Sequence, residues 1–94
     1  MNTLSGARKS AADIHRSISK VVRKVLERED IDPAVDLFDQ GATSMAFIRI
    51  VAQANEMYDI TIDAAALEEA SIDSLAKQVR AQTNGGLLKG KDER

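Results

Sequence analysis

The chain has 94 residues, of which 44% are hydrophobic and 30% charged, and its formal net charge is -2. This length predicts one domain with a single modest core, and the composition is ordinary for a soluble globular protein. The absence of cysteine excludes disulfides, a cysteine-based metal site and a nucleophilic thiol from the chain's own chemistry.

Membrane and secretory signals are absent from the sequence pattern. No stretch approaches the roughly 18 apolar residues of a membrane span, and the N-terminus lacks the uninterrupted apolar core of a secretory signal. We therefore expect a soluble cytoplasmic protein that does not act at a membrane.

Charge is distributed unevenly along the chain. Residues 1–28 carry seven basic against two acidic side chains, whereas residues 29–84 carry three basic against eleven acidic ones. A basic helix can bind nucleic acid. Here the basic segment has no aromatic residue and the acidic body would repel a polyanion, so we interpret it as a solvated helix face and expect no nucleic-acid partner.

The first predicted helix runs from a cap at Ser10 to about Arg28. Residues 1–9 are polar and aperiodic, which predicts a disordered lead. Ser10 followed by Asp13 has the form of a capping box. The apolar positions trace one helical stripe. They are Ala11, Ile14, Ile18, Val21, Val22, Val25 and Leu26.

His15 is the single histidine and lies next to this stripe. A catalytic base needs a nucleophile within hydrogen-bond reach, and Ser44 is the candidate. No acid is placed by any motif to orient a pair of His15 and Ser44. We therefore interpret His15 as a surface histidine, reject a hydrolase site and predict no catalytic residue.

A long connection, residues 29–43, follows the first helix. Pro33 is expected to help stop that helix, because it forces the residue before it out of helical conformation. Leu37 and Phe38 are expected to enter the core and fix the path of the loop. The acids of this segment do not match the calcium-loop spacing, so we expect them to be solvated and predict no metal site. They are Asp30, Asp32, Asp36 and Asp39.

Gly41 and Ser44 lie where this connection meets the second helix. Gly41 can adopt a positive φ, so the chain can turn there at little cost. Ser44 is then at or next to the helix N-terminus, where free N–H groups and the helix dipole favour a phosphate on its hydroxyl. The alternative is that Thr43 or Ser44 only caps the helix. The expected buried face is Phe47, Ile48, Val51, Ala54 and Tyr58.

Two shorter helices are predicted after an extended link over residues 59–62. Asp63 is expected to cap a short third helix over residues 64–69, with Leu67 as its large apolar anchor. Ser71 is expected to cap a fourth helix that ends at residues 84–86, followed by a flexible tail, residues 85–94. The inward positions of the fourth helix are Ile72, Leu75, Ala76 and Val79.

Three stretches resemble a known family. Residues 37–45, Leu-Phe-Asp-Gln-Gly-Ala-Thr-Ser-Met, are similar to the attachment segment of the acyl and peptidyl carrier proteins of fatty-acid, polyketide and nonribosomal-peptide synthesis. Residues 48–51 are similar to the second helix of peptidyl carriers, and residues 67–76 to their third-to-fourth helix junction. The resemblance covers about residues 10–84, taken as the carrier domain, and implies an all-α four-helix bundle with a long first loop and a short third helix.

The chain departs from the acyl carriers at two positions. Those proteins usually have aspartate before the modified serine and leucine after it, where this chain has Thr43 and Met45. The segment is therefore closer to the Gly-x-x-Ser of peptidyl and modular polyketide carriers.

The resemblance implies that Ser44 carries a covalent 4′-phosphopantetheine arm whose thiol holds acyl, aminoacyl or peptidyl cargo as a thioester. A phosphopantetheinyl transferase with Mg²⁺ would attach the arm, a ligase, adenylation enzyme or acyltransferase would load it, and an acceptor enzyme would unload it. We expect a monomer; the chain's length, close to that of one carrier module, favours a free-standing protein but leaves open whether the domain belongs to a larger synthase. Partner-docking residues are expected at Thr43, Met45, Arg49 and Leu67.

The alternative function is a non-catalytic helical adaptor that binds a partner protein through its second helix, with Ser44 only a cap. In either case we expect one shared core. Its predicted members are Ile18, Val22, Phe38, Ile48, Val51 and Leu75.

Overall fold

The computed structural model describes residues 11–92, with side chains described over residues 11–83. It contains three α-helices, α2 (Ala11–Leu26), α3 (Ser44–Tyr58) and α4 (Ile72–Asp92), and one short 3₁₀ helix, η1 (Ala64–Ala66). Residues 11–92 contain no strand, so the predicted all-helical class is confirmed there. The predicted lead, residues 1–9, lies outside the described residues.

The predicted count of four helices is not confirmed. In place of a third helix over residues 64–69 the chain forms only the three residues of η1, capped by the Asp63 side chain, which accepts a hydrogen bond from Ala65 N–H. A single short turn has too few internal hydrogen bonds to extend without packing, and all three residues of η1 are exposed.

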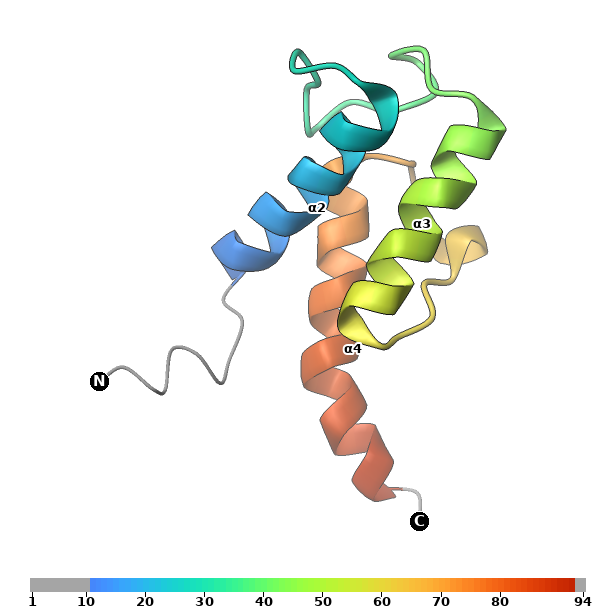
Figure 1. The fold of residues 1–94 in the computed structure, drawn as a ribbon. Coiled ribbons are helices and arrows are strands. Elements are labelled where there is room, and N and C mark those ends of the chain that lie inside the picture. The colour runs from blue at the N-terminus through green and yellow to red at the C-terminus, as the bar shows by residue number, and fades with distance from the viewer. Residues whose placement is uncertain (1–10, 93–94) are drawn as a thin grey trace, which may run out of the picture.

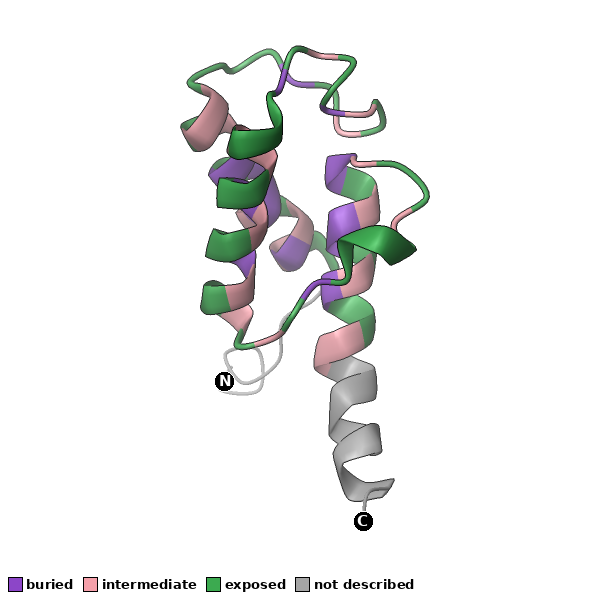
Figure 2. Cartoon of the chain, turned by 90° about the vertical axis from the view of Figure 1, so that its right-hand side faces the viewer, coloured by how far each residue is buried: buried purple, intermediate pink, exposed green. Residues whose placement is uncertain are grey.

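Helix α2 packs against both α3 and α4, and the three helices enclose one apolar core. In the view of Figure 1, α2 lies on the left, α3 on the right and α4 between them, and the long connection closes the upper end. In Figure 2 the outer turns of α3 are exposed, while buried segments of the helices face the interior. The buried apolar residues are Ile14, Ile18, Val21, Val22, Ile31, Leu37, Ala42, Ile50, Ala54, Ile62, Ile72, Leu75, Ala76 and Val79.

The orientation of α3 differs from the prediction. Ile50 is fully buried, whereas Ile48 is 58% exposed, so the expected burial of Ile48 is wrong. Residues 45–52 are apolar at every position except Arg49, so periodicity alone fits more than one face. The core takes the face of Ile50 and Ala54, with Phe47, Val51 and Tyr58 packed at its edge.

Phe38 is also not in the core. Phe38 is 44% exposed, and its ring packs on that of Phe47, with the centroids 5.3 Å apart. Leu37 takes the interior position instead and is fully buried, so the prediction that both residues enter the core holds for Leu37 alone. Since consecutive side chains of a turn point in different directions, one apolar pair cannot supply two core residues here.

Helix α2 ends before Pro33 can act on it. Glu27 adopts a left-handed conformation with φ of 57°, and Arg28 N–H donates to the Arg23 carbonyl at 3.1 Å, which is the Schellman pattern of helix termination. The prediction that Pro33 helps to stop this helix is therefore wrong. Pro33 has another part in the connection, described below.

Helix α4 confirms its predicted start and inward face. The Ser71 side chain accepts a hydrogen bond from Ser74 N–H at 3.1 Å, and the predicted inward residues are all buried. The predicted end at residues 84–86 is wrong, because the helix continues to Asp92. Glycine costs helix stability, by about 1 kcal/mol relative to alanine, but it can still adopt the helical conformation. None of the helices in the described part of the chain is long and apolar enough to cross a membrane.

Candidate attachment site at the start of helix α3

Ser44 is the first residue of α3, and the residue before it supplies the cap. Thr43 has an extended backbone, with φ of -89° and ψ of 167°, and its hydroxyl oxygen accepts a hydrogen bond from Ala46 N–H at 3.1 Å. The interpretation of Ser44 as only a cap is therefore wrong. Ser44 is exposed, and its hydroxyl is not needed to start the helix.

The first turn of α3 suits a phosphate on this hydroxyl. The first α-helical hydrogen bond runs from Phe47 N–H to the Thr43 carbonyl at 3.0 Å, so the N–H groups of Ser44 and Met45 precede the helical ladder. The positive end of the helix dipole lies at the same place. The residues present thus fit a phosphodiester attached to Ser44.

A closed turn delivers the chain to this helix. Gly41 has φ of 102°, as predicted from its position, and the N–H groups of Gln40 and Ala42 both donate to the Leu37 carbonyl, at 3.0 and 2.9 Å. Leu37 itself is fully buried. The turn is therefore fixed to the core at the residue whose carbonyl closes it.

The same connection is hydrogen-bonded to the start of α4. Leu37 N–H donates to the Ala70 carbonyl at 2.8 Å, and Ala70 N–H donates back to the Asp36 carboxylate at 3.1 Å. The Pro33 carbonyl accepts from Asp73 N–H at 3.0 Å, which satisfies one free donor of the α4 N-terminus. Asp36 is half-buried and bonded, so the expectation that all four acids are solvated is wrong for this one.

Arg28, just after α2, holds the other side of the connection. Its guanidinium donates to the Gln40 carbonyl and to the Asp30 carboxylate, the latter at 3.2 Å. The hydrogen bond from Arg28, helped by a backbone hydrogen bond and by the charge of Arg28, lowers the pKa of Asp30 below its ordinary value. One residue of the basic segment is thus used to position the loop.

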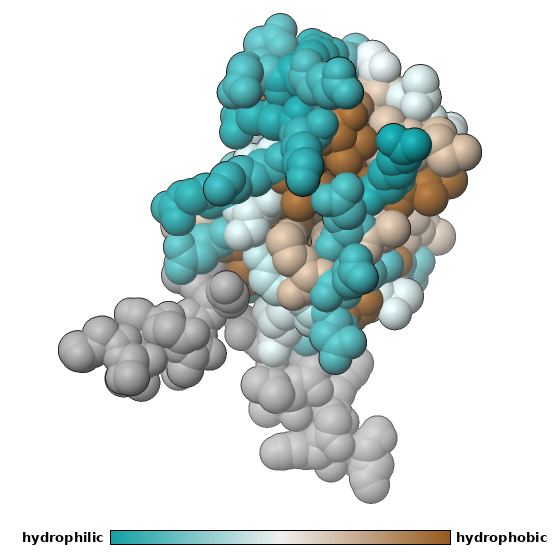
Figure 3. Space-filling view, viewed as in Figure 1, coloured by the Kyte–Doolittle hydropathy of each residue, from teal (hydrophilic) through white to brown (hydrophobic). Residues whose placement is uncertain are grey.

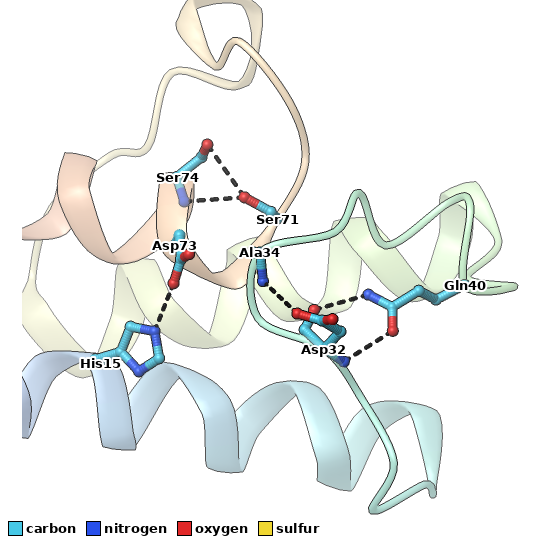
Figure 4. A network of polar contacts seen from close by, with 7 residues as sticks. All are labelled: His15, Asp32, Ala34, Gln40, Ser71, Asp73 and Ser74. Carbon is cyan, nitrogen blue, oxygen red and sulfur yellow. Dashed lines mark hydrogen bonds and ion pairs between the residues drawn. The ribbon is translucent and has the colours of Figure 1, made fainter.

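His15 pairs with an acid that the sequence did not indicate. Its Nε2 lies 2.7 Å from Oδ1 of Asp73, which joins α2 to α4 (Figure 4). Asp73 is in the first turn of α4, far from His15 in sequence, so no local motif signals the pair. The contact therefore ties the first turn of α4 to α2.

The predicted docking residues are not all in one place. Thr43, Met45 and Arg49 are exposed at the start of α3, and Met45 is 62% exposed. Leu67 is half-buried, packs against the core and follows η1. The sequence missed Ile48, whose exposure extends the apolar surface that begins at Met45.

An apolar hollow of about 270 Å³ adjoins Ile48. It opens between α3 and η1. Its lining residues are Phe47, Ile48, Val51, Ala52, Asn55 and Ala64. Figure 3 shows hydrophobic side chains reaching the surface on the α3 side of the molecule, whereas the α2 side is mostly hydrophilic. Among the described residues, no group of three or more His, Cys, Asp or Glu could hold a metal ion.

The fold and this geometry define a small all-helical domain that exposes a serine at the start of a helix, beside an apolar surface. A family model described as "Phosphopantetheine attachment site" matches residues 16–79, which is more than half of the chain. The chain therefore belongs to the family of phosphopantetheine-binding carrier domains, whose prosthetic group is a covalent 4′-phosphopantetheine. No curated protein and no solved structure matches it significantly.

Proposed function

We propose that Ser44 is the attachment residue of the arm. The observation that supports this proposal is that Thr43, and not Ser44, caps α3. The exposed Ser44 hydroxyl therefore stays available for modification. The two N–H groups that precede the helical ladder favour the phosphate that the modification adds.

The protein then works as a carrier of acyl, aminoacyl or peptidyl intermediates. The arm supplies a thiol that holds the cargo as a thioester, which the chain cannot do itself because it has no cysteine. Carrier domains generally do not catalyse reactions, and they work with modifying and biosynthetic enzymes. We assign this protein the same role, with a phosphopantetheinyl transferase, a loading enzyme and an acceptor enzyme as its successive partners.

The partners dock on the exposed face of α3 next to Ser44. Met45 and Ile48 supply an apolar contact one residue and one turn from the arm, and Arg49 supplies a charge beside it. Flexible methionine suits a surface that must accept several partners in turn. Thr43 and Leu67 were predicted as docking residues. Since Thr43 is used as the cap and Leu67 packs on the core, their contribution is smaller.

Intact-protein mass tests the attachment. Wild-type protein incubated with coenzyme A, Mg²⁺ and a broad-specificity transferase gains the mass of one arm, whereas Ser44→Ala gains none. Ser44→Ala keeps a helical circular-dichroism signal near wild type, because Thr43 still caps the helix. Modification of the alanine variant would contradict the proposal. Thioester capture with a panel of amino-acid, malonyl and acyl donors then identifies the class of cargo.

A further inference from the structure

The Gln40 side chain forms hydrogen bonds with the backbone of its own loop. Its Oε1 accepts a hydrogen bond from Asp32 N–H at 2.9 Å, and its Nε2 donates to the carbonyls of Asp32 and Val35, at 2.9 and 3.0 Å. Figure 4 shows the Gln40 amide facing Asp32 across the loop. One side chain thus joins the beginning of the connection to the turn that precedes α3.

The pattern of donors and acceptors is specific for an amide. A backbone N–H can only donate and a carbonyl can only accept, so the group that satisfies all three must present one acceptor and two donors on adjacent atoms. Glutamine does so. Glutamate has the same shape but places a second oxygen opposite two carbonyls, which loses two hydrogen bonds and adds repulsion.

The Gln40 main chain is held as firmly as its side chain. Its carbonyl accepts from the Arg28 guanidinium, and its N–H donates to the Leu37 carbonyl. The next residues are Gly41, with its positive φ, the buried Ala42 and the cap Thr43. Because Gln40 is held by both its side chain and its main chain within the turn that closes on Leu37, it limits the directions in which the chain can enter α3.

We infer that Gln40 is a positioning residue for modification of Ser44: its amide keeps the loop in the conformation that a transferase accepts. It does not touch the reacting atoms. The inference rests on the proposed function of Ser44. If the amide contacts are lost, only a fraction of the molecules present the serine correctly, so the apparent affinity of the transferase for the carrier falls by that fraction. Once bound, the serine reacts as before.

The test is steady-state kinetics of arm attachment with the carrier as the varied substrate. For Gln40→Glu we expect KM for the carrier to rise about tenfold or more while kcat stays within about twofold. Lowering the pH until the introduced carboxyl is protonated restores one donor and recovers part of the KM. Wild type over the same range corrects for the transferase's own pH dependence.

Gln78→Glu is the matched control. The Gln78 amide also forms hydrogen bonds with the backbone of an aspartate: it accepts from Asp63 N–H at 2.6 Å and donates to the Asp63 carbonyl at 3.2 Å. These contacts hold the segment before η1 and not the loop that leads to Ser44. Gln78→Glu loses the same kind of contact and gains the same charge. Because Gln78→Glu loses one donated hydrogen bond rather than two, we expect a smaller loss of thermal stability, and little change in KM.

Amide hydrogen exchange gives a readout that needs no transferase. In Gln40→Glu, the N–H groups of Asp32 and Ala42 should exchange faster than in wild type, while those in α4 should not. Unchanged KM in a folded Gln40→Glu, unchanged exchange of these amides, a fall in kcat alone, or an equal rise in KM for Gln78→Glu would each overturn the inference. A wild-type protein that gains no arm would instead reject the proposed function.

Discussion

The two segments that connect the α-helices, residues 27–43 and residues 59–71, begin with the same backbone conformation but are held in place by different contacts. Each begins with a non-glycine residue in left-handed conformation, Glu27 with φ of 57° and Asp59 with φ of 55°. Each also contains a hydrogen bond back across the helix end, from Arg28 to Arg23 and from Ile60 to Asn55. Both helix ends therefore share the 6→1 hydrogen bond of the Schellman motif, but the left-handed residue bonds differently: Glu27 N–H donates to the Lys24 carbonyl, and Asp59 N–H donates to the Asn55 carbonyl.

Glutamine side chains hold both segments, but these glutamines lie in different parts of the chain. In residues 27–43 it is Gln40, a member of the segment itself. In residues 59–71 the contacts come from α4, where Gln78 binds the backbone of Asp63 and Gln82 donates to the Thr61 carbonyl at 2.7 Å. The first segment thus supplies its own glutamine contacts in addition to its hydrogen bonds with the start of α4, whereas the second receives its glutamine contacts from α4. The segment with the internal glutamine contacts is the one that leads to Ser44.

Of the substitutions that test this difference between the segments, Leu37→Ala should have the largest effect, a loss of folding stability. Leu37 is fully buried and its main chain closes the turn before Ser44, so truncation should lower the free energy of unfolding by about 2–5 kcal/mol. Chemical denaturation measures the change. Val35→Ala, at an exposed position of the same segment, is the control and should cost less than about 0.5 kcal/mol. Equal costs would show that Leu37 does not anchor the segment.

Met45→Asp tests the surface to which the first segment leads. A charge on this exposed apolar side chain should slow arm attachment or loading by about an order of magnitude, roughly 1.4 kcal/mol, while the domain stays folded. Arg49→Ala should have a smaller effect that weakens as salt is added. Met57→Asp places the same charge on an exposed methionine near the far end of α3 and should leave the rates unchanged. Unchanged rates for Met45→Asp with every partner would remove this face of α3 as the docking site.

Arg28→Gln should produce the smallest effect. The guanidinium keeps the pKa of Asp30 low, so its loss should move the titration midpoint of that carboxyl upward, as followed by NMR of its carboxyl carbon. Because the folded-state pKa is lowered, the pair stabilises the fold above the unfolded pKa of Asp30. That contribution disappears as the pH falls through the folded value. A midpoint that stays in place would show that Arg28 does not act on Asp30.

Sequence patterns predicted the features that local chemistry decides. The positive φ of Gly41, the caps at Asp63 and Ser71, and the inward face of α4 follow from single residues or from clear periodicity, and the structure confirms them. Burial of Leu37 was also predicted correctly. In each case, the preference of one residue type or one helical period was enough.

The features that depend on distant partners could not be predicted this way. The choice between Ile48 and Ile50 depends on which face α2 and α4 leave open, because the local sequence is apolar on both sides. The pairing of His15 with Asp73 and the contacts of Gln40 and Gln78 join residues whose proximity only the fold creates. At the site, the sequence pointed to the start of α3 but left open whether Thr43 or Ser44 caps it, and the backbone geometry decided for Thr43.

Residue-level mapping of the arm by tandem mass spectrometry, on wild-type protein modified to completion, is the most direct test of Ser44 as the attachment residue. We predict a single modified site, Ser44, with Thr43 unmodified because its hydroxyl oxygen accepts a hydrogen bond from Ala46 N–H as the cap. An arm on Thr43, on Ser71 or on any other residue would contradict it. So would a folded protein that no transferase modifies.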